Sequence, residues 1–261
     1  MSTNVDNRSR QPKGTNKGGQ FAPETHEATP NDLDEAPFGQ GSDTPSLAEL
    51  AQQEPDLNGR QVIEALASEP VGSKRREHAK KLYIESINRN LIGEDQEWTI
   101  SYGEAGWTSR ILPYALDYGD LSYENDTGDK NYTGQDVPGT NLTRFKNGDA
   151  ALAQQLLDTV PGENLKDERQ NLAPTVENIL KFVEKHPDQA SFDGYVVSGE
   201  RPDERLSIDA VSVSPELLGL DEDATADDAN EKLYDLKLGE AAPPDETRWD
   251  KNQNRWNFWW D

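Results

Sequence analysis

Hydrophobic residues recur every three to four positions in several stretches of this chain, a spacing that places them on one face of a helix. The clearest stretch follows Ser73 and ends at Gly93, with its apolar positions at Ala79, Leu82, Tyr83, Ile87 and Leu91. The same pattern predicts further helices at 46–50, 58–69, 149–159, 174–186 and 225–236. Ser46 and Asn58 suit the N-terminal caps of the first two, because their side chains can accept a hydrogen bond from the first turn.

Hydrophobic and polar residues alternate in other stretches, as in half-buried strands. The alternation predicts a strand at 98–102, a second one within 107–118 that Pro113 either breaks or places at a sheet edge, and a hairpin of 195–197 with 206–213. A last aromatic strand covers 256–260, with Trp256, Phe258 and Trp260 on one face and Trp259 on the other. Residues 119–148 are rich in Gly, Asn, Asp and Tyr, which predicts a long loop.

Predicted helices and strands are segregated along the chain, which favours an α+β fold with a small, mostly antiparallel sheet. Residues 1–45 have too few apolar side chains for burial to offset the entropy of ordering them, so we expect a disordered tail there. The predicted organisation is therefore a tail at 1–45, a helical segment at 46–92 and an α+β body at 93–261.

Composition narrows the function classes. Fifty acidic and 26 basic residues give a net charge of −24, which argues against direct binding to duplex nucleic acid or to an anionic membrane. The chain has no Cys, which excludes disulfides, thiolate metal sites and a Cys nucleophile. With no long apolar stretch in the sequence, we expect a cytoplasmic protein.

One string stands out in the N-terminal segment, where residues 10–22 read RQPKGTNKGGQFA. It resembles a short motif, Arg-x-Pro-x-Gly-Thr-x-x-Gly-Gly-Gln-Phe-Ala, that precedes otherwise dissimilar proteins of actinobacterial phages and plasmids. The matching residues are Arg10, Pro12, Gly14, Thr15, Gly18, Gly19, Gln20, Phe21 and Ala22. The resemblance implies an origin in a mobile genetic element, and it assigns no catalytic or binding residue.

A second string has the beginning of a calcium-binding loop. Asp129, Asn131 and Thr133 supply oxygen atoms at alternate positions, and Gly134 permits the sharp bend that such a loop needs. The twelfth position is Thr140, where a bidentate Glu is expected. A weak calcium site and an ordinary polar loop are the two interpretations, and no other cofactor is predicted.

Charge is concentrated in two predicted helices. The helix at 73–91 has five basic residues in its first nine positions, and three interpretations stay open: phosphate contacts, pairing with acidic segments, and a solvated face. Six acidic residues lie at the start of the helix at 225–236: Asp221, Glu222, Asp223, Asp227, Asp228 and Glu231. They fit either favourable helix electrostatics or mimicry of the regularly spaced charges of DNA.

These features predict a non-enzymatic, acidic interaction protein of a mobile element, which binds a basic partner and acts as a DNA mimic on a nucleic-acid-binding protein. The six acids are the predicted charged face, and Trp256, Trp259 and Trp260 are either core residues or partner anchors. Two alternatives stay open. One is a carboxylate-dependent enzyme of unknown class that uses residues in the 95–136 region, and the other is a phage virion or assembly component.

Overall fold

The computed structural model describes residues 57–91, 102–121, 139–221 and 223–261. The chain divides into two units, Met1–Ala51 and Gln52–Asp261, and every described residue belongs to the second. The predicted tail at 1–45, the predicted helix at 46–50, nearly all of the predicted strand at 98–102, and Glu222 lie outside the described residues.

Five antiparallel strands form one sheet in the order β1-β2-β3-β5-β4. Their bounds are β1 Leu142–Gly148, β2 Ala190–Val197, β3 Arg205–Val213, β4 Glu246–Asp250 and β5 Arg255–Trp259. The sequence pattern correctly predicted the β2–β3 hairpin and the closing strand β5. It missed β4 and assigned β1 to the long loop.

Both missed strands have a physical explanation. In β1 only Thr143 and Phe145 are buried before Asn147, at a φ of 57°, interrupts the alternation next to a register shift. Strand β4 lies at the edge of the sheet, and its sequence ETRWD is mostly charged. Edge strands commonly bear charged side chains, which makes them resemble loops in a sequence.

The α-helices agree better with the sequence pattern. Their bounds are α2 Gly59–Ser68, α3 Lys74–Arg89, α4 Leu112–Ala115, α5 Ala150–Thr159, α6 Gly162–Asp167, α7 Val176–Lys185, α8 Pro215–Leu218 and α9 Ala226–Asp235. The predictions for α2, α3, α5, α7 and α9 are confirmed. Each of these five begins after a capping side chain that accepts a backbone N–H, supplied in turn by Asn58, Ser73, Asp149, Thr175 and Thr225.

The strand predicted within 107–118 is wrong. This stretch forms two 3₁₀ turns, η1 Trp107–Arg110 and η2 Leu116–Tyr118, on either side of α4. Pro113 lies in the first turn of α4, where a helix does not need its N–H. Buried side chains include both Ile111 and Leu112, and a half-buried strand does not bury consecutive residues.

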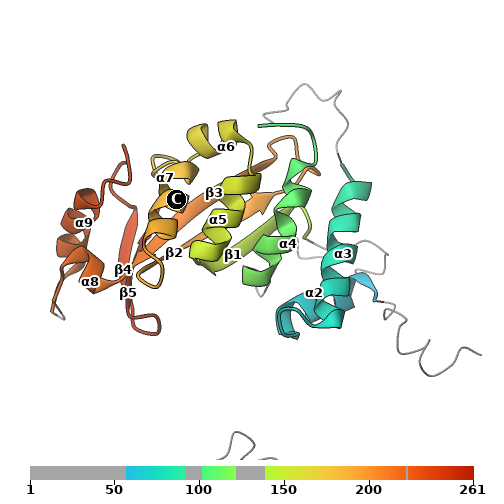
Figure 1. Ribbon diagram of the computed structural model, residues 1–261, viewed down its shortest axis with the longest axis horizontal. Helices are drawn as coiled ribbons and strands as arrows, with labels where there is room; N and C mark the ends of the chain where they lie inside the picture. The colour runs from blue at the N-terminus through green and yellow to red at the C-terminus, as the bar shows by residue number, and fades with distance from the viewer. Residues whose placement is uncertain (1–56, 92–101, 122–138, 222) are drawn as a thin grey trace, which may run out of the picture. The chain divides into compact units, whose positions relative to one another are not determined.

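The helices share one hydrophobic core with the sheet. Helices α5 and α7 lie over the sheet, α2 and α3 lie on its β1 side, and α8 and α9 lie beside β4 and β5 (Figure 1). The fold class is therefore α+β with an antiparallel sheet, as predicted. Within the described ranges, no helix is both long and apolar enough to cross a bilayer.

Candidate functional site

Acidic residues stabilise the first turn of α9. Thr225 and Asp228 form a capping box, in which the Asp228 carboxylate accepts hydrogen bonds from the backbone N (2.8 Å) and the hydroxyl (2.6 Å) of Thr225. These hydrogen bonds hold the pKa of Asp228 below its ordinary value. Asp227 adds a second negative charge in the first turn, where the helix dipole favours it. Favourable helix electrostatics therefore explains part of this acidic cluster.

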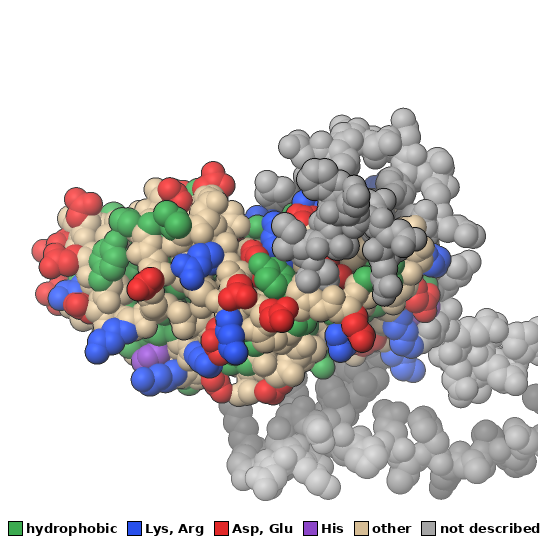
Figure 2. Space-filling model, turned by 90° about the horizontal axis from the view of Figure 1, so that it is seen from above, with side chains coloured by type: hydrophobic (Ala, Val, Ile, Leu, Met, Phe, Trp, Pro, Cys, Tyr) green, Lys and Arg blue, Asp and Glu red, His purple; other side chains and the backbone are tan. Residues whose placement is uncertain are grey.

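The remaining charge faces solvent. We call the described, exposed carboxylates between residues 216 and 231 the acidic end, and they are Glu216, Asp221, Asp223, Asp227, Asp228 and Glu231. From residue 215 to 236 the sequence has eight acidic residues and one basic residue, Lys232, whose Nζ lies 3.6 Å from Asp235. Within the described part of the chain, no carboxylate of the acidic end is in an ion pair. Figure 2 shows acidic side chains gathered at the end of this unit that α8 and α9 form.

A cleft of about 560 Å³ opens beside the acidic end. Its apolar lining comes from the α8–α9 region and from the β4–β5 hairpin: Pro215, Leu220, Ala224, Trp249 and Trp256. Its polar lining residues are Glu216, Asp221 and Asn254. The cleft thus combines two indoles with two carboxylates, and Glu216 and Asp221 belong to both features.

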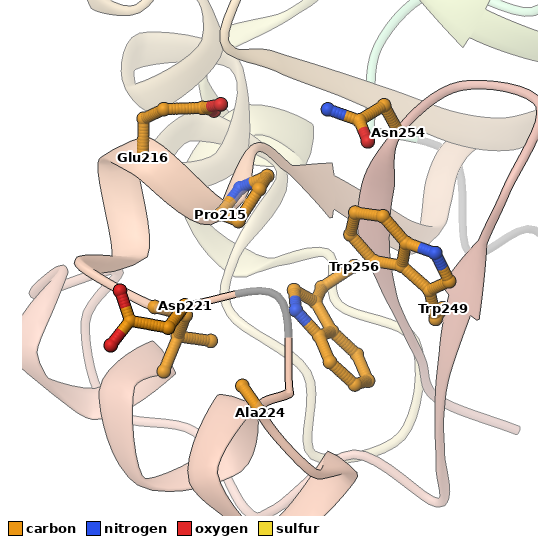
Figure 3. Close-up of a pocket in the computed structure, with 8 residues that line it drawn as sticks. Pro215, Glu216, Asp221, Ala224, Trp249, Asn254 and Trp256 are labelled. Atoms are coloured by element: carbon orange, nitrogen blue, oxygen red, sulfur yellow. The ribbon is translucent and has the colours of Figure 1, made fainter.

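The pairing of β4 with β5 brings the two indoles together. Trp249 lies opposite Trp256 in the strand register, and their ring centroids are 5.4 Å apart with an interplanar angle of 57°. Trp256 is buried and Trp249 is half-buried. The Glu216 carboxylate and the Asn254 side-chain amide point toward each other across the cleft, whereas the Asp221 carboxylate points away from the indoles (Figure 3). Glu216 is therefore the negative charge directed into the cleft.

The three predicted tryptophan anchors have different environments. Trp256 contributes to the cleft, and Trp259 is half-buried on the opposite face of β5. Trp260 is only 1% exposed, and its indole N–H donates to the carbonyl oxygen of Ala242 at 3.1 Å. The structure therefore contradicts the expectation that Trp260 is an accessible anchor, because its side chain is enclosed in the core.

Six of the eight residues that line the cleft were not among the predicted site residues, and Glu216, Trp249 and Asn254 are the most important of them. A signal for two of them is present in the sequence. Trp249 and Trp256 flank the polar stretch DKNQNR at 250–255, and a short polar stretch between two aromatic segments is typical of a hairpin turn. Recognising that hairpin would have placed the two indoles on neighbouring strands.

Two basic residues of α3, Arg76 and Lys80, are explained by contacts within the protein. Arg76 and Lys80 are each 6% exposed. Arg76 donates to the carbonyl oxygens of Leu66, Glu69 (3.0 Å) and Leu116 (2.8 Å), and Lys80 Nζ lies 2.5 Å from a carboxylate oxygen of Asp117. Of the three interpretations of this helix, intramolecular pairing is the one that holds for these two bases.

Some carboxylates of the 95–136 region, which the enzyme hypothesis would use for catalysis, form ion pairs with lysine side chains. In the 95–136 region, Asp117 pairs with Lys80, and Asp120 lies 2.6 Å from Lys146 Nζ. Asp129, Asn131 and Thr133 of the calcium-loop candidate lie outside the described residues. Among the residues that the structure does describe, no group of three or more His, Asp or Glu side chains is placed to hold a metal ion. The enzyme and calcium hypotheses stay predictions.

Two further carboxylates lie in the sheet, Asp209 buried and Asp193 half-buried. Asp209 on β3 is 4% exposed, and one of its oxygens accepts a hydrogen bond from Arg144 on β1 at 2.6 Å. Asp193 on β2 accepts a hydrogen bond from the backbone N of Asn147 at 2.8 Å. Burial raises the pKa of Asp193, and the nearby Asp209 charge raises it further. These acids tie β1 to the centre of the sheet, so we assign them a structural role.

Comparison with protein-family models finds no match to this chain, and comparisons with curated proteins and with solved structures find none either. No residue role is therefore transferred from a relative. Function is inferred from the acidic end and the adjoining cleft.

Proposed function

We propose that this chain is a non-enzymatic interaction protein of a mobile genetic element, and that in the cytoplasm it binds a basic protein partner through the acidic end. The observation that carries the proposal is the exposure of six carboxylates on α8, α9 and the segment between them, none of them in an ion pair within the described residues. The resemblance of residues 10–22 to the leaders of phage and plasmid proteins supports the mobile-element origin.

Electrostatics explains why several charges are needed. A single exposed ion pair contributes only about 0–1 kcal/mol, because water and salt screen it. Several like charges at one end of a folded unit produce a combined potential, which attracts a basic partner and orients it before contact. Association should therefore weaken strongly as the salt concentration rises.

The more specific form of the proposal is DNA mimicry, with a nucleic-acid-binding protein as the partner. Three of the carboxylates lie on α9, a helix that is fixed at its start by the capping box. Fixed carboxylates can occupy the positions of backbone phosphates in a DNA-binding groove. A mimic of this kind competes with duplex DNA for its partner.

The test compares two variants that remove the same charge. One carries Asp223→Asn, Asp227→Asn and Glu231→Gln at the acidic end, and Asp228 is left in place because it caps α9. The control carries Glu163→Gln, Asp167→Asn and Glu184→Gln, which are exposed positions on α6 and α7. Each protein is immobilised, exposed to lysate of an actinobacterial host at low salt, and eluted with duplex DNA or with salt.

We expect the wild type and the control to retain the same basic, nucleic-acid-binding proteins, to release them to duplex DNA, and to lose them at high salt. The acidic-end variant should retain little of that set. Equal retention by the acidic-end variant would refute the role of these carboxylates. Retention of basic proteins that DNA does not displace would refute mimicry alone.

A further inference from the structure

We propose that the cleft between α8 and the β4–β5 hairpin binds the guanidinium group of an arginine side chain that the partner presents. This inference rests on the proposed function, since it names the chemical group that the basic partner inserts beside the acidic end. The cleft contributes the three elements that recognise arginine: aromatic faces, a carboxylate and a neutral polar acceptor.

The indoles provide the aromatic surface. Trp249 and Trp256 line the cleft with their ring planes inclined by 57°, so a flat group that stacks on one ring meets the other at an angle. The face of an indole attracts a cation through its quadrupole, and Trp does so more strongly than other aromatic side chains. Trp249 lies on the edge strand β4 and stays half-buried, which leaves part of its ring accessible to a partner.

The polar lining favours a planar, forked cation. In Figure 3 the Glu216 carboxylate faces the nitrogen of the Asn254 side-chain amide across the cleft, and the amide oxygen points toward the indoles. A guanidinium can stack on an indole and at the same time donate to a carboxylate and to an amide oxygen lying in its plane. The lysine ammonium is a compact, strongly hydrated charge, so it cannot stack flat on an indole while it donates to two acceptors in one plane.

The cleft is large enough to receive an arginine side chain. At about 560 Å³ the cleft falls within the range of small-ligand sites, which span about 300–1,000 Å³. The carboxylates of Asp221 and Asp223 are exposed nearby and add to the negative potential around its mouth. The cleft therefore complements an arginine within a basic surface better than it complements a neutral or anionic ligand.

The experiment uses three tripeptides, acetyl-Gly-X-Gly-amide, in which X is arginine, lysine or citrulline. Citrulline keeps the shape of arginine without its charge. Binding is followed by NMR from the indole N–H signals of the full chain, assigned with Trp249→Phe and Trp256→Phe. We expect the arginine peptide to shift the Trp249 signal in a saturable way, the lysine peptide to bind at least about threefold more weakly, and citrulline to cause no shift.

Variants show whether the shift comes from the cleft. Trp249→Ala, followed through the Trp256 signal, and Glu216→Gln should each weaken binding of the arginine peptide about tenfold. Two controls should stay within about twofold of the wild type, because they remove the same kind of group elsewhere: Tyr234→Ala, an exposed aromatic on α9, and Glu184→Gln, an exposed acid on α7. Glu216 is exposed, so its substitution tests the cleft without disturbing the core.

Equal binding of the arginine and citrulline peptides, no saturable shift of Trp249, or equal losses in the controls would overturn the inference. That failure is distinct from failure of the proposed function. If the peptide does not bind but the acidic-end variant still loses its basic partners, only the arginine site is wrong. If the peptide binds but that variant keeps its partners, the acidic end is wrong as the docking surface.

Discussion

The hydroxyl and the backbone N of Thr108 both donate to one oxygen of the Glu204 carboxylate, at 2.7 and 2.9 Å. The other oxygen accepts from the backbone N of Gly106 at 2.8 Å. Glu204 is only 2% exposed, so these three donors replace water around a buried charge. In this way the residue before β3 fixes the start of η1, nearly a hundred positions earlier in the chain.

Replacing Glu204 should therefore be costly. In Glu204→Gln an amide NH₂ faces a backbone N–H donor, and the charge that strengthened the remaining hydrogen bonds is lost. We expect the free energy of unfolding to fall by about 2 kcal/mol, measured by urea denaturation. The control Glu163→Gln, at an exposed position on α6, should change it by less than about 0.5 kcal/mol. Equal effects of the two substitutions would contradict the role assigned to Glu204.

Lys80 should contribute to stability where Lys74 does not, although both belong to α3. Lys80 Nζ lies 2.5 Å from Asp117 and 2.9 Å from Glu77, and its side chain is 7% exposed, whereas Lys74 is exposed. Lys80→Ala leaves the Asp117 carboxylate, 26% exposed, without its nearest cation. We expect a loss of about 2 kcal/mol for Lys80→Ala and less than about 0.5 kcal/mol for Lys74→Ala in chemical denaturation. A loss in free energy of unfolding for Lys80→Ala as small as that for Lys74→Ala would show that the ion pair of Lys80 is not formed in solution.

Asp193 should make stability decrease as the pH rises through the acidic range. Burial raises the pKa of Asp193 above its ordinary value of 3.8, so the folded state holds this proton more tightly than the unfolded state does. Stability that is present below pH 3.8 is lost as the pH rises through the folded-state pKa. Asp193→Asn keeps an oxygen for the Asn147 N–H and removes the charge, and it should unfold at a higher urea concentration than the wild type at pH 7.

The difference in stability between Asp193→Asn and the wild type should become smaller as the pH is lowered toward 3.8. Asp158→Asn is a suitable control because Asp158 is exposed on α5. This substitution should change the free energy of unfolding by less than about 0.5 kcal/mol both at pH 7 and near pH 3.8. A wild type that is more stable than Asp193→Asn at pH 7 would mean that the Asp193 charge is favourable in the folded state.

Two glycines should respond in opposite ways to the same substitution. A Cβ on Gly194 in β2 would lie 2.4 Å from the carbonyl oxygen of Ser207 and 2.9 Å from the ring of Phe145, so the neighbouring strand or the core must shift. A Cβ on Gly162, in the first turn of α6, meets nothing within 4 Å. We expect Gly194→Ala to lower the free energy of unfolding by about 2 kcal/mol or more, and Gly162→Ala to raise it by about 0.5 kcal/mol. Thermal denaturation that ranks the two variants the other way would contradict the packing of β1 on β2.

Several features of this protein could be read from the sequence because they depend on residues close to one another in the chain. The capping residues Ser73 and Thr225 act within a single turn, and the apolar spacing of α3 and α7 is set by helical geometry alone. The alternation in β5 likewise places Trp256 and Phe258 on the same side of the strand. These local rules were sufficient for five helices, three strands and the α+β class.

Other features were decided by contacts between distant segments. The stretch at 107–118 is helical partly because Glu204 holds its first turn, and Arg76 and Lys80 are buried because Leu116 and Asp117 meet them. The cleft forms only when the β4–β5 hairpin sets Trp249 against Trp256 and brings Asn254 opposite Glu216. Composition indicated an excess of negative charge, but only the packing of α8 and α9 beside the hairpin decided which carboxylates face solvent together. A sequence specifies which side chains are available, whereas the environment of each charge depends on the folded chain as a whole.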